Sequence, residues 1–474
     1  MTEMITGLGM SPLEALVLLG AVALVLARWT SAGVRRPVTL AAVALVLLPG
    51  VALVALGLRW HMVPVLAGAG VALAFAVPTF LARRADRPVW RARWWLAAPG
   101  SVLCLVLIAF GPVTAWALPV PVFPEPSGQY SVGTTVLEWT DPDREETATP
   151  TPSDHRTVVV QLWYPAHRGA TDKHQAQYLG RTRPEARTVA DALAGYLGVP
   201  GFLLDNLAPA RTHSMFDIAA TPEGGRFPVV LFSPGLGGVR TQNTAWAEEL
   251  ASRGYIVAGL DHPYDSAAVV LADGRAIRTM VTATGDPVHW TAIRAADLSF
   301  VLTQLDRLDK GELPSPLTGR IDIHRAAATG HSIGGAAALQ AARQDTRFAA
   351  VINLDGFPRD PANQPIRQPI LAVAHPVDPQ ENPTYLPSLD QVLQRGTSPS
   401  YLLTVPGSAH LTFTDGPLYL PPVPALVGSL GPLESLRMTV DVSAAFLDTT
   451  LRDKPDNLSA RLSAHGQLKT YRRP

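Results

Sequence analysis

The sequence contains a single cysteine, Cys104, among 474 residues. One thiol cannot form a disulfide within the chain, and it cannot supply the several cysteine ligands of a cysteine-based zinc site. Charged residues are also scarce, at 16% of the chain, and 39 lysines and arginines balance 39 aspartates and glutamates. Because no basic stripe with interleaved aromatic residues stands out, we do not expect nucleic acid as a partner. No histidine pair or carboxylate cluster has the spacing of metal ligands, so we expect no metal and no other cofactor.

Long apolar runs take the place of the missing charges in the N-terminal part of the chain. The mean hydropathy of +0.16 is high for a wholly water-soluble protein. Three of the four runs approach the roughly 20 residues that a helix needs to cross a bilayer. The runs cover residues 13–27, 38–58, 62–81 and 94–118. We therefore expect residues 1–118 to form an all-α region of four transmembrane helices, with the lipid bilayer as a partner.

The distribution of arginine predicts how these helices are oriented. The second connection holds only Arg59, whereas the first and third are rich in arginine. Their arginines are Arg28, Arg35 and Arg36, and then Arg83, Arg84, Arg87, Arg91 and Arg93. Since positive connections stay on the cytoplasmic side, both ends of the helical region should face outward. The sequence thus predicts a multi-pass protein of a bacterial-type cell membrane, with the rest of the chain extracytoplasmic.

The remainder of the chain is expected to form one large domain behind a short linker. Residues 119–129 are rich in proline and read as a stiff linker. The domain is predicted to cover residues 130–455, and residues 456–474 are expected to be a polar tail. Residues 166–223 lack clear strand character, and they are interpreted either as a cap over a pocket or as an ordinary packed subdomain.

The first two strands of this domain are expected to pair with each other. Residues 130–139 and 157–164 are rich in β-branched and aromatic side chains. They flank a polar, proline-containing insert at 141–155. This arrangement predicts an antiparallel pair joined by a long, solvated loop.

A serine flanked by glycines is the clearest chemical motif. Gly330-His-Ser332-Ile333-Gly334 follows a short run of small apolar residues and precedes a run of alanines. A strand, a sharp turn and a helix in this order are typical of the nucleophile elbow of an α/β-hydrolase. Glycines on either side of the serine let the strand and the helix approach closely. Ser332 is therefore the candidate nucleophile, and the N–H of Ile333 is a candidate donor to an oxyanion.

A second glycine-rich turn follows an earlier buried strand. Residues 229–232 are apolar, and Ser-Pro-Gly-Leu-Gly-Gly follows at 233–238. In this fold the turn after the third strand supplies the second oxyanion donor, for which the N–H of Leu236 is the candidate. Further strands and helices alternate along the chain, which predicts an α/β fold with a mostly parallel sheet and helices on both faces.

The histidine and the carboxylate of a triad must follow the serine in this fold. Asp261, His262 and Asp265 precede it and are therefore interpreted as a hydrogen-bonded structural cluster. Of the later histidines, His410 stands in a small-residue loop directly after the predicted strand 401–405, where it can reach the elbow. His375 comes straight off an earlier strand and His465 lies in the predicted tail, so His410 is the candidate general base.

Three aspartates are candidates for the acid. Asp355 follows the predicted strand 349–354, and Asp378 follows the predicted strand 370–374. Asp360 is a weaker third choice. Sheet geometry alone does not decide between Asp355 and Asp378.

Four blocks of sequence, in this order, resemble the platelet-activating-factor acetylhydrolase family. They are Phe-Ser-Pro-Gly-Leu-Gly-Gly at 232–238, Gly-His-Ser-Ile-Gly-Gly at 330–335, Leu-Asp-Gly-Phe-Pro at 354–358 and Gly-Ser-Ala-His at 407–410. The resemblance covers roughly residues 129–448, and it implies Asp355 as the acid with Leu236 and Ile333 as oxyanion donors. The sequence differs from the family at Pro234, where a histidine is usual, and in its four apolar N-terminal stretches.

The resemblance implies a membrane-anchored serine esterase or lipase that acts on short-chain or phospholipid-type esters through an acyl-enzyme. A cutinase-like or polyester-degrading enzyme, or a general carboxylesterase, shares the elbow and is the nearest alternative. A non-catalytic membrane sensor or scaffold with the hydrolase shape is the alternative from another class.

Overall fold

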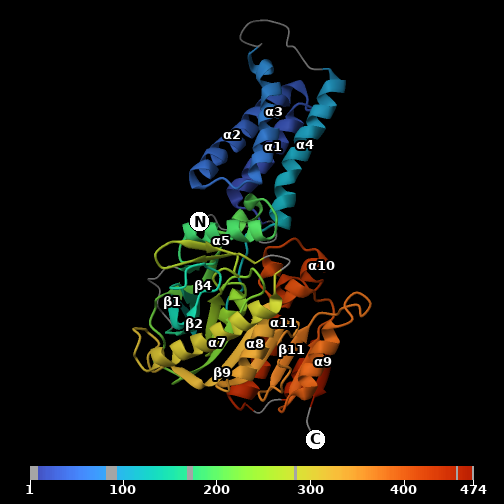
Figure 1. The fold of residues 1–474 in the computed structure, drawn as a ribbon. Coiled ribbons are helices and arrows are strands. Elements are labelled where there is room, and N and C mark those ends of the chain that lie inside the picture. Colours follow the sequence, from blue (N-terminus) through green and yellow to red (C-terminus); the bar gives the residue numbers. More distant parts are fainter. Residues whose placement is uncertain (1–8, 82–92, 168–174, 282–284, 455–456, 472–474) are drawn as a thin grey trace. The chain divides into compact units, whose positions relative to one another are not determined.

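The computed structural model describes residues 9–81, 93–167, 175–281, 285–454 and 457–471. The chain divides into two compact units, an N-terminal unit Met1–Val120 and a C-terminal unit Pro121–Pro474 (Figure 1). Most arginines of the third predicted connection, between residues 83 and 91, lie outside the described residues.

The N-terminal unit contains four apolar helices. They are α1 Pro12–Ala27, α2 Ala32–Leu56, α3 Met62–Leu81 and α4 Trp94–Ala117. Two stretches, Gly33–Leu56 and Trp94–Ala117, are long and apolar enough to cross a membrane, whereas Pro12–Ala27 and Met62–Val77 are shorter. Of the four expected spans, two helices are thus long and apolar enough. Helix α1 falls short because it begins only at Pro12, where Ser11 caps it.

The helices of this unit expose large apolar side chains. In α2, Val51 and Val54 are more than 60% exposed, and in α4, Val106 and Val113 are about as exposed. Polar side chains are instead buried near one end: the Glu14 carboxylate lies 3.3 Å from Arg59 and 3.3 Å from His61. Large apolar side chains exposed along the helices are the reverse of the pattern in a water-soluble bundle.

The C-terminal unit is built on an eleven-stranded sheet in the order β13-β12-β11-β10-β9-β5-β6-β2-β1-β4-β3. The strands from β12 to β6 pair in parallel, while β2 pairs antiparallel with β6 and with β1, and β13 antiparallel with β12. The strands are β1 Ser131–Glu145, β2 His155–Ala166, β3 Gln175–Gln177, β4 Arg211–Phe216, β5 Phe227–Ser233, β6 Ile256–Asp261, β9 Ile321–His331, β10 Phe348–Leu354, β11 Ile370–Ala374, β12 Ser400–Thr404 and β13 Gln467–Tyr471, with a separate hairpin of β7 Ala268–Val270 and β8 Ala276–Arg278.

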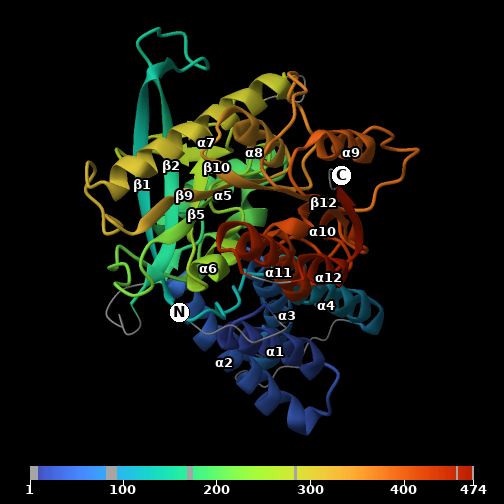
Figure 2. The same cartoon turned by 90° about the horizontal axis from the view of Figure 1, so that it is seen from below.

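Helices cover both faces of this sheet, as the alternation of strands and helices predicts (Figure 2). One face packs against α7 Pro287–Asp309, α8 Ile333–Gln344 and α9 Tyr385–Arg395, and the other against α6 Thr244–Ser252, α11 Pro432–Leu451 and α12 Leu458–Ser463. Strand β5 shows why: Val229 and Leu231 join the first core, and Val230 and Phe232 the second. A strand buried on both faces reads as a continuous apolar run.

The prediction that residues 456–474 form a polar tail is wrong for residues 457–471, which the structure describes. Strand β13 pairs with β12 along its whole length. Helix α12 buries Leu458 and Leu462 in the core. A polar composition did not reveal these contacts, because only two apolar side chains of the helix are needed to dock it.

The polar insert after β1 is shorter and more ordered than expected. Strand β1 continues to Glu145, which leaves only residues 146–154 as a loop. Glu146 is buried, with its carboxylate 2.8 Å from the guanidinium of Arg156. Charged side chains that would be solvated in a free loop are here paired inside the protein.

Residues 166–223 contribute to the sheet as well as to helices. Strands β3 and β4 extend its edge beyond β1. Between them lie α5 Arg183–Tyr196 and the 3₁₀ helix η2 Gly201–Leu207. Strand character was missed here because β3 is only three residues long. The remaining short helices are η3 His410–Phe413, η4 Gly416–Leu418 and α10 Pro424–Val427.

Candidate active site

The elbow, residues 330–334, lies between β9 and α8 as predicted. Ser332 has φ 55° and ψ −123°, a strained backbone conformation for a residue other than glycine. A side chain at Gly334 would collide with the carbonyl oxygen of Ser233, and one at Gly330 would collide with the backbone of Gly334. The two glycines therefore allow the turn that presents the half-buried Ser332 at the start of α8.

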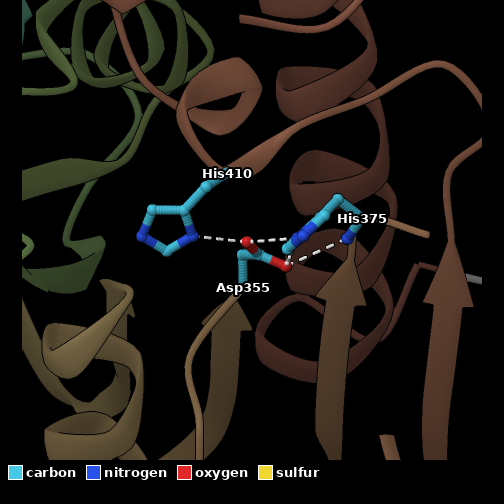
Figure 3. Close-up of side chains that lie close together, drawn as sticks. All are labelled: Asp355, His375 and His410. Carbon is cyan, nitrogen blue, oxygen red and sulfur yellow. Dashed lines mark hydrogen bonds and ion pairs between the residues drawn. The ribbon is translucent and has the colours of Figure 1, made fainter. Parts of the chain in front are cut away.

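Asp355 follows β10 and is the centre of a cluster of donors (Figure 3). Its carboxylate lies 2.6 Å from Nδ1 of His410 and 2.7 Å and 2.8 Å from Nδ1 of His375. The backbone N–H of His375 and the hydroxyl of Tyr385 also donate to it, at 2.9 Å and 2.8 Å. Burial raises the pKa of Asp355, but the hydrogen bonds from both histidines outweigh burial and hold the pKa below its ordinary value.

The other two candidate acids lie elsewhere. Asp378 is exposed and accepts a hydrogen bond from the backbone N–H of Gln380 at 2.8 Å. Asp360 pairs with Arg343. Of the three carboxylates, the structure therefore brings Asp355 to His410.

His410 lies beside the elbow through its contact with the residue before the serine. The ring centroids of His331 and His410 are 4.6 Å apart, and Nε2 of His331 is 2.8 Å from the carbonyl oxygen of His410. Because Nδ1 of His410 faces a carboxylate, which only accepts, that nitrogen carries the proton. Nε2 is then the ring nitrogen that does not face the carboxylate, on a side chain that is 45% exposed.

The glycine-rich turn at residues 233–238, which is predicted to supply an oxyanion donor and is called the oxyanion turn below, runs alongside the elbow. Ser233 is paired with Gly330 at the end of the β5–β9 ladder. A side chain at Gly334 would also meet the carbonyl of Pro234, so the turn lies directly against the first turn of α8. Leu236 in this turn and Ile333 in α8 are thus brought to the same end of the sheet.

A fully buried polar cluster lies behind the oxyanion turn. Ser233 Oγ is 2.9 Å from Nε2 of His262, and Nδ1 of His262 is 2.7 Å from Asp297. All three are completely buried, so no substrate reaches this second Ser-His-Asp chain. Burial and the nearby Arg294 lower the pKa of His262 to about 4, so the ring is neutral at pH 7. The prediction of a structural cluster is met for His262, and for Asp265 through Arg294, whereas the Asp261 carboxylate pairs with Arg240. Ser233, Arg294 and Asp297 were missed because they lie far from His262 in the sequence, the first on β5 and the other two on α7.

His375 is the other residue that sequence reasoning missed. Its position directly after a strand argues against it as the general base, and the structure places it on the acid instead. Ligand atoms of Asp355, His375 and His410 all lie within 4.8 Å of one another, a set that a divalent metal ion could use. Both Nδ1 atoms, however, are at hydrogen-bonding distance from the carboxylate, so a metal would have to displace those protons. Spacing along the sequence does not reveal this group, because its members come from the ends of three strands.

Residues 119–282 and 304–465 match the family model of platelet-activating factor acetylhydrolase, isoform II. The chain belongs to this family. A probable 1-alkyl-2-acetylglycerophosphocholine esterase of Arthroderma benhamiae is 26% identical over 67% of the chain and 82% of its own length. The platelet-activating factor acetylhydrolase of Cavia porcellus is 29% identical over 40% of the chain and 49% of its own length.

Among solved structures, a ferulic acid esterase from Streptomyces cinnamoneus is 30% identical with a TM-score of 0.61, and the match covers 73% of this chain and 98% of the esterase. The resemblance predicted from the four blocks is therefore confirmed. The C-terminal unit is an α/β-hydrolase fold, and the acetylhydrolase and esterase relatives identify the chain as a carboxylic-ester hydrolase.

Proposed function

We propose that this family member is a membrane-anchored serine esterase that works through an acyl-enzyme. The observation that carries the proposal is the contact of 2.6 Å between the buried Asp355 carboxylate and Nδ1 of His410, beside a strained serine at a helix N-terminus. A carboxylate that holds a histidine in one tautomer next to a serine is the arrangement that activates a hydroxyl as a nucleophile.

The reaction follows from the roles of these groups. Ser332 Oγ attacks the ester carbonyl while Nε2 of His410 removes its proton, and Asp355 stabilises the imidazolium that forms. The N–H groups of Leu236 and Ile333 bind the negative oxygen of the tetrahedral intermediate. His410 then gives the proton to the leaving alcohol, and the acyl group remains on Ser332. Water, activated by His410 in turn, hydrolyses the acyl-enzyme and restores the serine.

Short-chain or phospholipid-type esters are the substrates that we propose. The name of the fungal relative specifies an acetyl group on a glycerophosphocholine. In this chain the ring of Tyr196, at the end of α5, lies against Gly237 of the oxyanion turn, where a side chain would collide with it. We infer that α5, within the proposed cap at 166–223, limits the space for the acyl group.

We further propose that α1 to α4 anchor the enzyme in a cell membrane with the C-terminal unit extracytoplasmic. The lengths of α2 and α4 and the exposed apolar side chains of both support this proposal. In water such surfaces are costly, whereas lipid tails accommodate them. The orientation rests on the arginines of the first and third connections.

Labelling with a fluorophosphonate tests the proposal on the full chain purified in detergent. The wild type should label and Ser332→Ala should not, with a loss of kcat on p-nitrophenyl acetate of about 10⁴-fold, or roughly 5 kcal/mol of barrier. Ser388→Ala on α9 is the matched control and should label normally. If the wild type does not label, or if Ser332→Ala keeps its activity, the chain is not a serine esterase and the non-catalytic scaffold becomes the better account.

The ferulic acid esterase with the same fold favours a second candidate, a general carboxylesterase that accepts aromatic acyl groups. The values of kcat/KM for 1-alkyl-2-acetylglycerophosphocholine, p-nitrophenyl esters of two to ten carbons, methyl ferulate and an aliphatic polyester discriminate between the candidates. Preference for the acetyl phospholipid supports the first proposal. Preference for methyl ferulate or for the polyester supports the carboxylesterase or the cutinase-like alternative.

A further inference from the structure

The peptide groups on both sides of Gly235 are held by two side chains, the buried Arg294 and the half-buried Gln242. The guanidinium of Arg294 donates to the carbonyl of Gly235 at 3.1 Å and to that of Pro234 at 2.6 Å. On the other side, the N–H of Gly235 donates to Oε1 of Gln242 at 2.7 Å. Within the turn the N–H of Gly238 also donates to the carbonyl of Gly235, at 2.9 Å. Because glycines restrain their peptide planes weakly, these contacts together set the orientation.

The contact to the Gly235 carbonyl also determines where the next N–H points. Among the described residues every peptide bond is trans. In a trans peptide the C=O of one residue and the N–H of the next point in opposite directions. Because Arg294 binds the carbonyl of Gly235 from the protein interior, the N–H of Leu236 points away from the interior.

We propose that Arg294 and Gln242 are positioning residues that aim the oxyanion donor of Leu236. This inference rests on the proposed function. Arg294 suits the role because it is completely buried and itself fixed, with Asp265 bound through two hydrogen bonds of 2.6 Å and 2.7 Å. The planar guanidinium has enough donors to bind one carboxylate and two carbonyls at once, which a lysine ammonium cannot do with the same geometry.

Gln242 links the oxyanion turn to the general base. Nε2 of His331 faces the carbonyl oxygen of His410, so this nitrogen must carry the ring proton. Nδ1 of His331 then accepts from Nε2 of Gln242 at 3.0 Å, which leaves Oε1 of Gln242 for the N–H of Gly235. Burial is the main reason that the pKa of His331 falls to about 3, and the neutral ring keeps this single direction of donation at neutral pH.

Two further hydrogen bonds, one between main-chain groups and one from a side chain, make the same connection. The N–H of Asp415 donates to the carbonyl of Gln242 at 3.0 Å, and Nδ2 of Asn243 donates to the carbonyl of Phe413 at 2.7 Å. The loop that carries His410 and the turn that carries Leu236 are therefore tied to one segment. A change at Gln242 should reach both.

Two substitutions at Gln242 test the inference. Gln242→Leu removes both hydrogen bonds of the side chain, whereas Gln242→Glu keeps an acceptor for Gly235. Removal of one oxyanion donor lowers kcat by about 10²- to 10³-fold. Gln242→Leu should only turn the N–H of Leu236 away from the oxyanion, so it should lower kcat by roughly 30- to 100-fold. KM should change by less than about threefold, and Gln242→Glu should recover at least part of the lost rate.

A readout that a purely structural role would not move is the binding of transition-state analogues. A short-chain trifluoromethyl ketone forms a negative oxygen when the serine adds to it, and the corresponding methyl ketone adds far less. Affinity for the trifluoromethyl ketone should fall in parallel with kcat in Gln242→Leu, while weak binding of the methyl ketone stays unchanged. Arg294→Lys should show the same selective loss of trifluoromethyl ketone affinity, provided that its melting temperature shows it to be folded. If it does not fold, the comparison of Gln242→Leu with Gln242→Glu decides.

Gln368→Leu is the control, because it removes another glutamine side chain that hydrogen-bonds to the backbone: Gln368 is buried and donates to the carbonyl of Ala342 at 2.9 Å. It should lose stability without the change in analogue affinity. The inference is overturned if Gln242→Leu keeps full kcat, or if its affinities for both ketones fall equally. Activity retained by Ser332→Ala would instead refute the proposed function itself.

Discussion

His375 binds the carboxylate of Asp355 from the side opposite His410 (Figure 3). The carboxylate is therefore shared between two imidazoles, and its position does not depend on His410 alone. With the backbone N–H of His375 and the Tyr385 hydroxyl added, its oxygens have several donors. This explains how an acid that is buried almost completely remains ionised.

Exchange of the candidate acids for amides separates their roles. Asp355→Asn removes the charge that stabilises the His410 imidazolium and offers an N–H where an acceptor is needed, so kcat should fall by roughly 10³- to 10⁴-fold. Asp378→Asn alters only an exposed turn and should stay within about twofold of the wild type. Both are measured side by side on p-nitrophenyl acetate. A larger loss in Asp378→Asn would make that residue the acid.

The contact with Asp355 should make stability depend on pH through His375. The hydrogen bond that His375 donates to the Asp355 carboxylate raises the pKa of His375 above its ordinary value of 6.5, although burial opposes the shift. The stabilisation is then complete below about pH 6.5 and is lost as the pH rises through the raised value. The melting temperature of the wild type should exceed that of His375→Gln most at pH 6, and the difference should shrink towards pH 9.

The other groups that face Asp355 are His410 and Tyr385, and both are unchanged in His375→Gln. His324→Gln, at an exposed histidine, is the control and should show no such trend. A difference between wild type and His375→Gln that grows with pH would show that His375 is not stabilised in its charged form by Asp355.

Asn353 supports the turn that carries the acid. It is completely buried, and its side chain accepts from the N–H of Gly356 at 2.7 Å and donates to the carbonyl of Gly356 at 2.8 Å. Asp355, between them, has a φ of 57°, which a residue other than glycine adopts only when its surroundings hold it there. Asn353→Ala leaves two buried polar groups unpaired and should cost about 2–4 kcal/mol in the free energy of unfolding.

The same change should reduce kcat, because the Asp355 backbone loses its support. Urea unfolding and p-nitrophenyl acetate hydrolysis measure the two effects. Asn382→Ala, at an exposed asparagine, should alter neither. Full activity in a strongly destabilised Asn353→Ala would mean that Asp355 does not need this support.

Local sequence was enough to find the serine and the histidine of the site. The elbow is a local turn whose glycines are needed by contacts within a few residues and with one neighbouring strand. His410 was found because few histidines follow the serine. The acid was different: Asp355 and Asp378 both follow strands, and only the resemblance to a family separated them, since the decisive contact spans 55 residues of sequence.

Residues whose role depends on distant partners were not predictable. Arg294 lies in the middle of a helix, and nothing near it in sequence indicates that it binds the Gly235 carbonyl 59 positions away. His375 looked too early in the chain to serve the triad, because only the order of strands in the sheet brings β11 beside β10. Periodicity predicted the central strands well, since burial on both faces leaves a continuous apolar run.

The C-terminal segment offers a direct test of the part of the fold that was predicted wrongly. Leu462 of α12 is completely buried in the second core, so Leu462→Ala should cost about 2–5 kcal/mol in the free energy of unfolding. Leu433→Ala, in the first turn of α11, truncates a leucine that is 49% exposed and should cost less than about 1 kcal/mol. Urea unfolding of both variants gives the comparison. Equal and small losses would mean that residues 457–471 lie loosely on the domain, as their polar composition suggests, whereas a large loss confined to Leu462→Ala requires α12 to be docked on the sheet.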